Sequence, residues 1–181
     1  FSIMFAERKG KISSNEAQVL LEEIKQIPDI LEDNLQEFQN HTAEVAKIIK
    51  HQPVILFLGS GPNYGTAMFC AAKVCEACGI VSFAQDLEEF AHVENLCYPD
   101  DMPVFILAPD GKSTWRADQI LKFAQTLGKQ VMILTDGVSL ELPVDNRKNT
   151  ILSGFIREQF SPLVYHVPGT LLAAFLAKEL N

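Results

Sequence analysis

A lysine and a glutamate three residues apart carry the most suggestive chemistry in the chain. Lys73 and Glu76 lie within residues 70–78, whose other members are small and apolar, as in a tightly packed helix. A spacing of i and i+3 places both charged groups on one face of a helix. A carboxylate beside a cation in an apolar setting is suited to moving a proton. The alternative is a partly exposed ion pair that adds little to stability, and the two residues alone leave both interpretations open.

A histidine follows in the polar segment Glu88-Glu89-Phe90-Ala91-His92. Imidazole has an unperturbed pKa of about 6.5, so His92 is a candidate general acid or base. A solvated or packing histidine is the alternative. Further along, Ser113 or Thr114 opens an expected helix and is first of all an N-cap, although an anion can bind at the same helix end.

A glycine-rich turn separates an expected strand from an expected helix. Its pattern, Gly59-x-Gly61-x-x-x-Gly65, is close to a dinucleotide-binding fingerprint, in which a pyrophosphate sits on the helix N-terminus. The second interval is one residue too long, however, and Pro62 removes an N–H donor from the loop. We therefore expect a structural turn, with an NAD-binding oxidoreductase as the alternative.

The pair Cys75-x-x-Cys78 raises the possibility of redox or zinc chemistry, with His92 and Cys97 as further ligands. A redox pair usually opens a helix, where the helix dipole lowers a thiol pKa, whereas this pair closes one. The sequence favours buried structural thiols. We expect neither a metal ion nor an organic cofactor.

Composition restricts the class of protein that can carry these residues. The chain has 181 residues, 48% of them hydrophobic, which predicts one domain with a sizeable core. Four cysteines make no disulfide framework, and no apolar run approaches the roughly 20 residues of a membrane span. A net charge of −8 argues against a nucleic-acid module. The lack of a signal peptide predicts a cytoplasmic location.

Alternating apolar segments predict the elements that position the candidate residues. The run Val54-Ile55-Leu56-Phe57-Leu58 is typical of a strand buried on both faces. Helices are expected on either side of Pro28, which we expect to interrupt the first of them. Further strands are expected at 80–84, 104–107, 131–134 and, more weakly, 150–152, with helices at 66–78, 114–127 and 161–180. This alternation predicts an α/β fold, a three-layer α/β/α sandwich with a five-stranded parallel sheet.

The pattern of residues from Leu58 to His92 resembles the second sugar isomerase (SIS) domain of glucosamine-6-phosphate synthase and of related double-SIS phosphosugar isomerases and deaminases. The resemblance covers nearly the whole chain from about Glu16. The residues that carry it are Gly59, Gly61, Tyr64, Lys73-x-x-Glu76, Glu89-x-x-His92, Asp101-Met102-Pro103-Val104, Ala108-Pro109, and the C-terminal Pro162-x-x-Tyr165-x-Val167-Pro168-x-x-Leu171-Leu172-Ala173.

The resemblance implies a role for each of the three candidate residues. Glu76 matches the carboxylate that shuttles a proton between C1 and C2 of an open-chain sugar phosphate. Lys73 matches the lysine that stabilises the enediolate and holds that carboxylate. His92 matches the histidine of ring opening, which in the synthase reaches the site of a neighbouring subunit. Such a mechanism needs no metal or cofactor.

Several positions depart from the family pattern. Phe69 replaces an acid one turn before the lysine, and Val93-Glu94 replaces the Gly-Pro that follows the histidine. The serine-rich phosphate loop of a first SIS copy is replaced by Ala108-Pro109-Asp110, and no glutaminase segment is present. We therefore expect part of a larger phosphosugar isomerase or deaminase and not a complete glutamine-dependent amidotransferase.

Domain organisation and partners follow from the same resemblance. Residues 1–13 are expected to be the closing helix of a preceding domain or a linker, and residues 14–181 the SIS domain. The expected ligand is a sugar phosphate or amino-sugar phosphate, and the expected protein partners are a second copy in a homodimer, a preceding SIS domain, or both. We expect no contact with nucleic acid or membrane. A non-catalytic SIS domain that senses a sugar phosphate for a regulator is the alternative.

Overall fold

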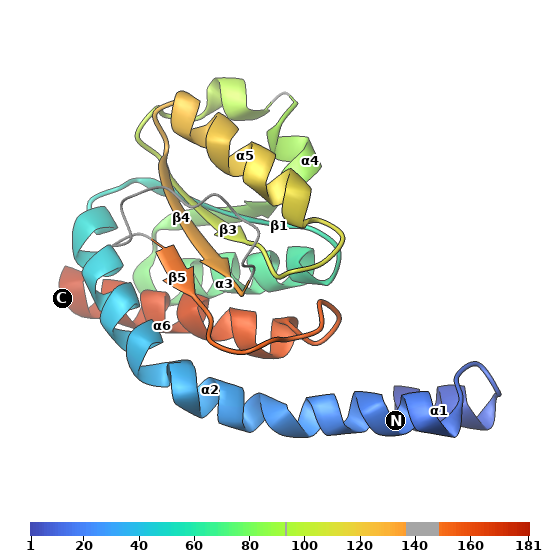
Figure 1. Ribbon diagram of the computed structural model, residues 1–181. Helices are drawn as coiled ribbons and strands as arrows, with labels where there is room; N and C mark the ends of the chain where they lie inside the picture. The colour runs from blue at the N-terminus through green and yellow to red at the C-terminus, as the bar shows by residue number, and fades with distance from the viewer. Residues whose placement is uncertain (93, 137–148) are drawn as a thin grey trace.

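A five-stranded, all-parallel sheet forms the centre of the molecule in a computed structural model that describes residues 1–92, 94–136 and 149–181 (Figure 1). The strands lie in the order β2-β1-β3-β4-β5. Their bounds are β1 Val54–Gly59, β2 Val81–Gln85, β3 Pro103–Leu107, β4 Gln130–Thr135 and β5 Asn149–Ile151. The predicted α/β fold with five parallel strands is confirmed.

Helices cover both faces of the sheet and make the predicted three layers (Figure 1). The first strand shows why, because its side chains alternate between two cores. Ile55 and Phe57 pack with the helices of one layer, and Leu56 and Leu58 pack with those of the other. The first layer contains α2 (Ser14–Ile49), α3 (Pro62–Cys78) and α6 (Pro162–Leu180), and the second contains α4 (Leu87–Phe90) and α5 (Thr114–Thr126).

Helix α2 is continuous, so the prediction that Pro28 interrupts it is wrong. A capping box opens α2, in which the Ser13 side chain accepts from the Glu16 backbone N–H and the Glu16 carboxylate accepts from the Ser13 N–H. Pro28 lies inside the helix on an exposed position, where water can satisfy the carbonyl group that loses its partner. Residues on the buried side of the helix, such as Ile27 and Phe38, pack in the core and hold the helix together across the proline.

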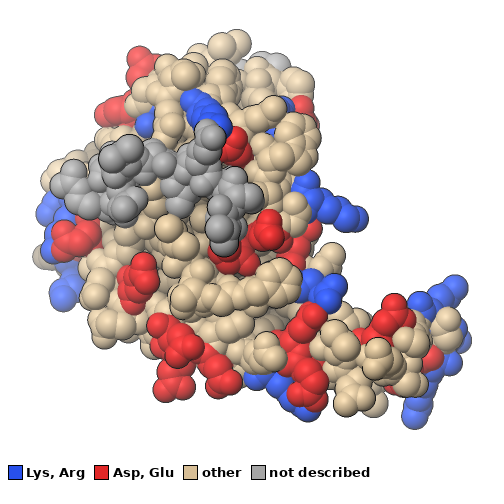
Figure 2. Space-filling view, viewed as in Figure 1, with Lys and Arg blue, Asp and Glu red and all other residues tan. Residues whose placement is uncertain are grey.

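The N-terminal arm, defined here as residues 1–26, reaches beyond the sheet layers. Helix α1 (Ser2–Arg8) lies beside the start of α2 and buries none of its residues. Figure 2 shows the arm projecting from the body, with basic side chains at its tip. That residues 1–13 belong to a preceding domain remains a prediction.

Two short elements between β2 and β3 were not expected. They are α4 and the 3₁₀ helix η1 (Glu94–Cys97), and each has only four residues, which is too few to show a periodic pattern in sequence. Val93, one of the departures noted above, lies outside the described residues. Within the part of the chain that the structure describes, no helix is both long and apolar enough to cross a bilayer.

Candidate functional site

Lys73 and Glu76 form an ion pair on the outer face of α3. The distance from Lys73 Nζ to Glu76 Oε2 is 2.7 Å, and the two side chains are 37% and 68% exposed. The hydrogen bond that Lys73 donates lowers the pKa of Glu76 below its ordinary value, with the positive charge of Lys73 adding to the effect. Glu76 is thus an ionised, accessible carboxylate, able to accept a proton from a molecule placed against α3.

An apolar groove begins one helical turn from this pair. Its lining comes from the N-terminal halves of α3 and α6 and includes Phe69, Thr66 and His166. The Lys73 ammonium lies 5.5 Å from the centre of the Phe69 ring, and the His166 ring meets the same ring edge-on at 5.7 Å. Phe69 therefore links the ion pair to the groove, and the face combines a charged pair with apolar surface.

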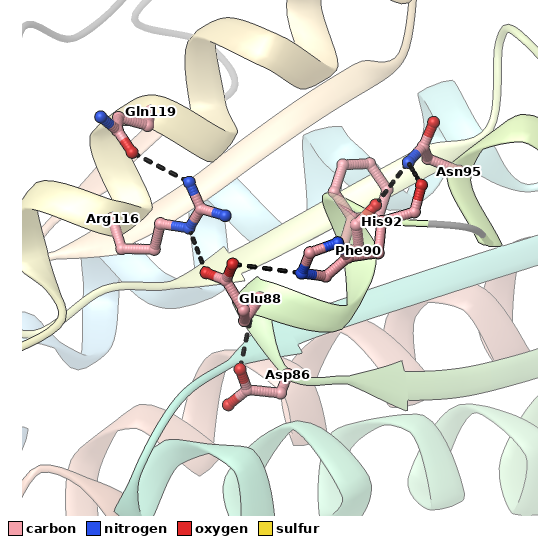
Figure 3. A network of polar contacts seen from close by, with 7 residues as sticks. All are labelled: Asp86, Glu88, Phe90, His92, Asn95, Arg116 and Gln119. Carbon is pink, nitrogen blue, oxygen red and sulfur yellow. Dashed lines mark hydrogen bonds and ion pairs between the residues drawn. The ribbon is translucent and has the colours of Figure 1, made fainter.

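His92 lies in the other layer, just after α4. Its Nε2 atom is 3.3 Å from Glu88 Oε1, and the imidazole is 60% exposed (Figure 3). Helix α3 packs on β1, β2 and α6, whereas α4 packs on α5 and β1. The structure therefore joins Lys73 to Glu76 but does not bring His92 to them within one chain, because the sheet separates the two layers.

The segment that carries His92 is held by hydrogen bonds at both ends. The Asp86 carboxylate caps α4 by accepting from the Glu88 backbone N–H at 2.9 Å and from the Ser60 hydroxyl at 2.7 Å. The buried Asn95 amide donates to the carbonyl groups of Phe90 and His92 at 2.8 and 3.2 Å. Asp86 thus serves as a helix cap here.

The carboxyl edge of the sheet holds a polar cluster that sequence analysis missed. Asp136, directly after β4, accepts hydrogen bonds from the Asp110 backbone N–H at 2.8 Å and from the Tyr165 hydroxyl at 2.7 Å. Burial raises the pKa of Tyr165, and the negative charge of Asp136 raises it further. Tyr165 is therefore a permanent donor that fixes Asp136 at this edge.

The carboxylate of Glu158, a residue between β5 and α6, contacts the loop before α5. Glu158 Oε2 accepts from the Lys112 backbone N–H at 3.2 Å, and Glu158 Oε1 lies 3.5 Å from the Ser113 hydroxyl. Ser113 is the N-cap residue, as predicted, but its side chain makes no capping bond. The Glu158 carboxylate therefore lies at the helix end where the sequence left the binding of an anion as the alternative. No local signal in the sequence pairs residue 158 with residue 112, because the contact depends on the path of the chain after β5.

The glycine-rich turn and the cysteines have structural explanations. A Cβ on Gly59 would overlap the Asn63 carbonyl group, so the turn after β1 requires glycine for close packing. The prediction that Cys75 and Cys78 are buried thiols is wrong for Cys75, which is exposed, and Cys78 is only partly buried. The Cys75 sulfur instead contacts the backbone of Ser82. Among the described residues, no three His, Cys, Asp or Glu side chains gather as a metal site would require.

Comparison with known proteins agrees with the resemblance seen in the sequence. The chain is 27% identical over 172 residues to glutamine–fructose-6-phosphate aminotransferase (isomerizing) from Zymomonas mobilis, a match that covers 95% of this chain and 28% of the relative. No protein-family model matches the chain. The chain thus spans less than a third of the length of this curated relative.

Solved structures show the same fold. The C-terminal domain of glucosamine-fructose-6-phosphate aminotransferase from Francisella tularensis superimposes with a TM-score of 0.91 at 20% identity, covering 99% of this chain and 50% of that one. Glucosamine-6-phosphate deaminase from Thermotoga maritima gives a TM-score of 0.63 at 19% identity, covering 97% and 48%. The chain is therefore similar in sequence to isomerizing aminotransferases and has the α/β fold of the C-terminal domain of such an enzyme.

Proposed function

We propose that the chain is the proton-transfer part of a larger phosphosugar isomerase or deaminase. The observation that carries the proposal is the Lys73–Glu76 ion pair on the open face of α3, at the positions that match the proton shuttle of the related family. An aldose–ketose interconversion needs one base that takes a proton from one carbon and returns it to the next. Glu76 is the base, and Lys73 stabilises the negative charge that grows on the enediolate oxygen.

A second protein unit must complete such a site. Glu76 alone faces water, where its carboxylate is a weak base and substrate is not held. Large apolar side chains are exposed nearby on the same helix and on α6, and they are Tyr64, Met68, Phe69 and Leu163. Covering this face would remove water from both the apolar groups and Glu76, and it would strengthen the interaction of Glu76 with Lys73. We infer that the covering unit is a preceding SIS domain or a second copy of the chain.

The phosphate group of the substrate is expected to bind that second unit. At the carboxyl edge of this sheet, carboxylates already accept the loop donors, with Asp136 bound to the Asp110 N–H and Glu158 bound to the Lys112 N–H. A dianionic phosphate would meet negative charge there. Two backbone donors at the edge that binds ligands in many open α/β sheets are thus taken by carboxylates of the chain itself.

His92 fits ring opening only if it acts on another unit's substrate. It lies in the α4–α5 layer, whereas Glu76 lies in the α2–α3–α6 layer. Two copies arranged with α4 of one near α3 of the other would bring the residues together. We therefore propose a homodimer as the working form.

The test uses the full-length protein that contains this chain. We expect Glu76→Gln to reduce turnover of fructose 6-phosphate or of an amino-sugar phosphate by about 100-fold or more, and to abolish exchange of the C1 or C2 hydrogen with D2O. Glu22→Gln is the matched control, because Glu22 also pairs with a lysine three residues away, at 2.6 Å, on an exposed helix face. Unchanged turnover in Glu76→Gln would contradict the proposal, and tight sugar-phosphate binding without turnover in the parent protein would favour the sensor.

A further inference from the structure

We propose that Glu88 is a positioning residue for His92, and that Arg116 in turn fixes Glu88. The inference rests on the proposed role of His92 in ring opening and adds two residues to it. Neither residue was singled out by the sequence, since Glu88 appears there only within the polar segment before His92 and Arg116 only within the expected helix at 114–127.

The Glu88 carboxylate uses both of its oxygen atoms (Figure 3). Oε1 lies 3.3 Å from His92 Nε2, and Oε2 lies 2.6 Å from Arg116 Nε in an ion pair. His92 and Glu88 share one short segment, whereas Arg116 comes from α5, 24 or more positions further along the chain. The imidazole is therefore tied, through one carboxylate, to a helix that packs on the sheet.

Arg116 is suited to hold the side chains of Glu88 and His92 in place. Its side chain is only 23% exposed, and its guanidinium also donates to the Gln119 side chain at 2.9 Å. Its neighbours Ala117 and Ile120 are buried in the core beneath α5. Arg116 meets the carboxylate through Nε alone, so it holds Glu88 as an ion pair, by its charge and from a largely buried position.

Hydrogen bonds hold the start of the segment that leads to His92 and the His92 carbonyl group, so the imidazole is the part that needs orientation. Asp86 holds the Glu88 N–H, and Asn95 holds the His92 carbonyl group. An imidazole that is 60% exposed would otherwise sample several rotamers, and a misplaced acid–base group loses much of its catalytic effect.

The geometry also selects the atom of His92 that reacts. A carboxylate 3.3 Å from Nε2 favours the tautomer of the neutral imidazole that carries its proton on Nε2 and its lone pair on Nδ1. Nδ1 can then take the proton of the anomeric hydroxyl group and deliver a proton to the ring oxygen. The bond between the anomeric carbon and the ring oxygen breaks as the carbonyl group forms, and the histidine ends the step in its starting protonation state.

The test compares two substrates in the full-length protein. We expect Glu88→Ala to lower kcat on a ring-forming sugar phosphate by about 10-fold, with KM changed less than about 2-fold, because it loosens the reacting group without touching the substrate. Turnover of a phosphosugar analogue that cannot close a ring should be unchanged, which a merely structural defect would not allow. Arg116→Met should give a smaller loss of the same kind. Glu44→Ala, which breaks the exposed Glu44–Lys47 pair on α2, is the matched control.

A comparison with His92→Asn separates the proposed role of His92 in ring opening from the proposed positioning role of Glu88. If His92→Asn lowers turnover and Glu88→Ala does not, Glu88 has no positioning role. If both lower it, Glu88→Ala should cause no further loss in a His92→Asn background. If His92→Asn itself has no effect, the proposed role of His92 fails. The positioning claim is then decided by ¹⁵N NMR of the neutral imidazole, where the parent should show the Nε2–H tautomer and Glu88→Ala a mixture. An unchanged spectrum in Glu88→Ala would overturn the inference.

Discussion

Gly169 of α6 lies directly against Cys70 of α3, and a Cβ on residue 169 would overlap the Cys70 sulfur. This contact brings the two helices close enough to bury Cys70 completely, and burial raises the pKa of its thiol to about 12. Cys70 thus lies on the side of α3 that packs against α6, whereas Glu76 lies on an exposed side of the same helix.

The first prediction concerns this helix contact. Gly169→Ala should lower the free energy of unfolding by about 1–3 kcal/mol, because the added methyl group forces α3 and α6 apart. Gly65→Ala should instead raise it by up to about 1 kcal/mol, since Gly65 is also helical and a Cβ there meets nothing within 4 Å. Urea unfolding of the two variants checks the pair. Equal effects in both would mean that α3 and α6 do not approach as closely as described.

The second prediction concerns the charge that holds Glu76 ionised. Lys73→Met should raise the pKa of Glu76 toward its ordinary value of 4.5, because the lysine hydrogen bond that lowers it is lost. Carboxyl-carbon NMR titration of the variant measures this directly. Lys25→Met, which removes the matching Lys25–Glu22 pair on α2, should leave the Glu76 titration unchanged. No change on Lys73→Met would show that the pair does not form in solution.

The third prediction concerns the link between the N-terminal arm and the segment before α6. Arg157 donates two hydrogen bonds to Glu23, each at 2.6 Å, and these lower the pKa of Glu23. Because the folded-state pKa is below the unfolded one, the stabilisation is fully present above the unfolded pKa of about 4.3 and is lost as the pH falls through the lower, folded value. Glu23→Gln should therefore lower the free energy of unfolding by roughly 0.5–1 kcal/mol at pH 7, since both side chains are partly exposed.

The control for this prediction is the pH dependence of the stability lost in Glu23→Gln. The difference between the parent and Glu23→Gln should shrink as the pH is lowered from 5 toward 3, and Arg157→Gln should behave in the same way. Denaturant unfolding at several pH values gives the comparison. A difference that stays constant over this range would show that Glu23 stabilises the arm by packing and not by its charge.

The layers and the Lys73–Glu76 pair were predictable from the sequence, because a continuous apolar strand at 54–58, its alternation with helical segments and an i, i+3 spacing are local properties of the chain. The sequence-based prediction erred at Pro28, where packing of the opposite helix face outweighed one missing hydrogen bond. The packing of distant segments set the partners of Glu88 and Glu158 and placed His92 across the sheet from Glu76. These contacts join residues far apart in the chain, and their free energies depend on distances that only the folded sheet and its helices set.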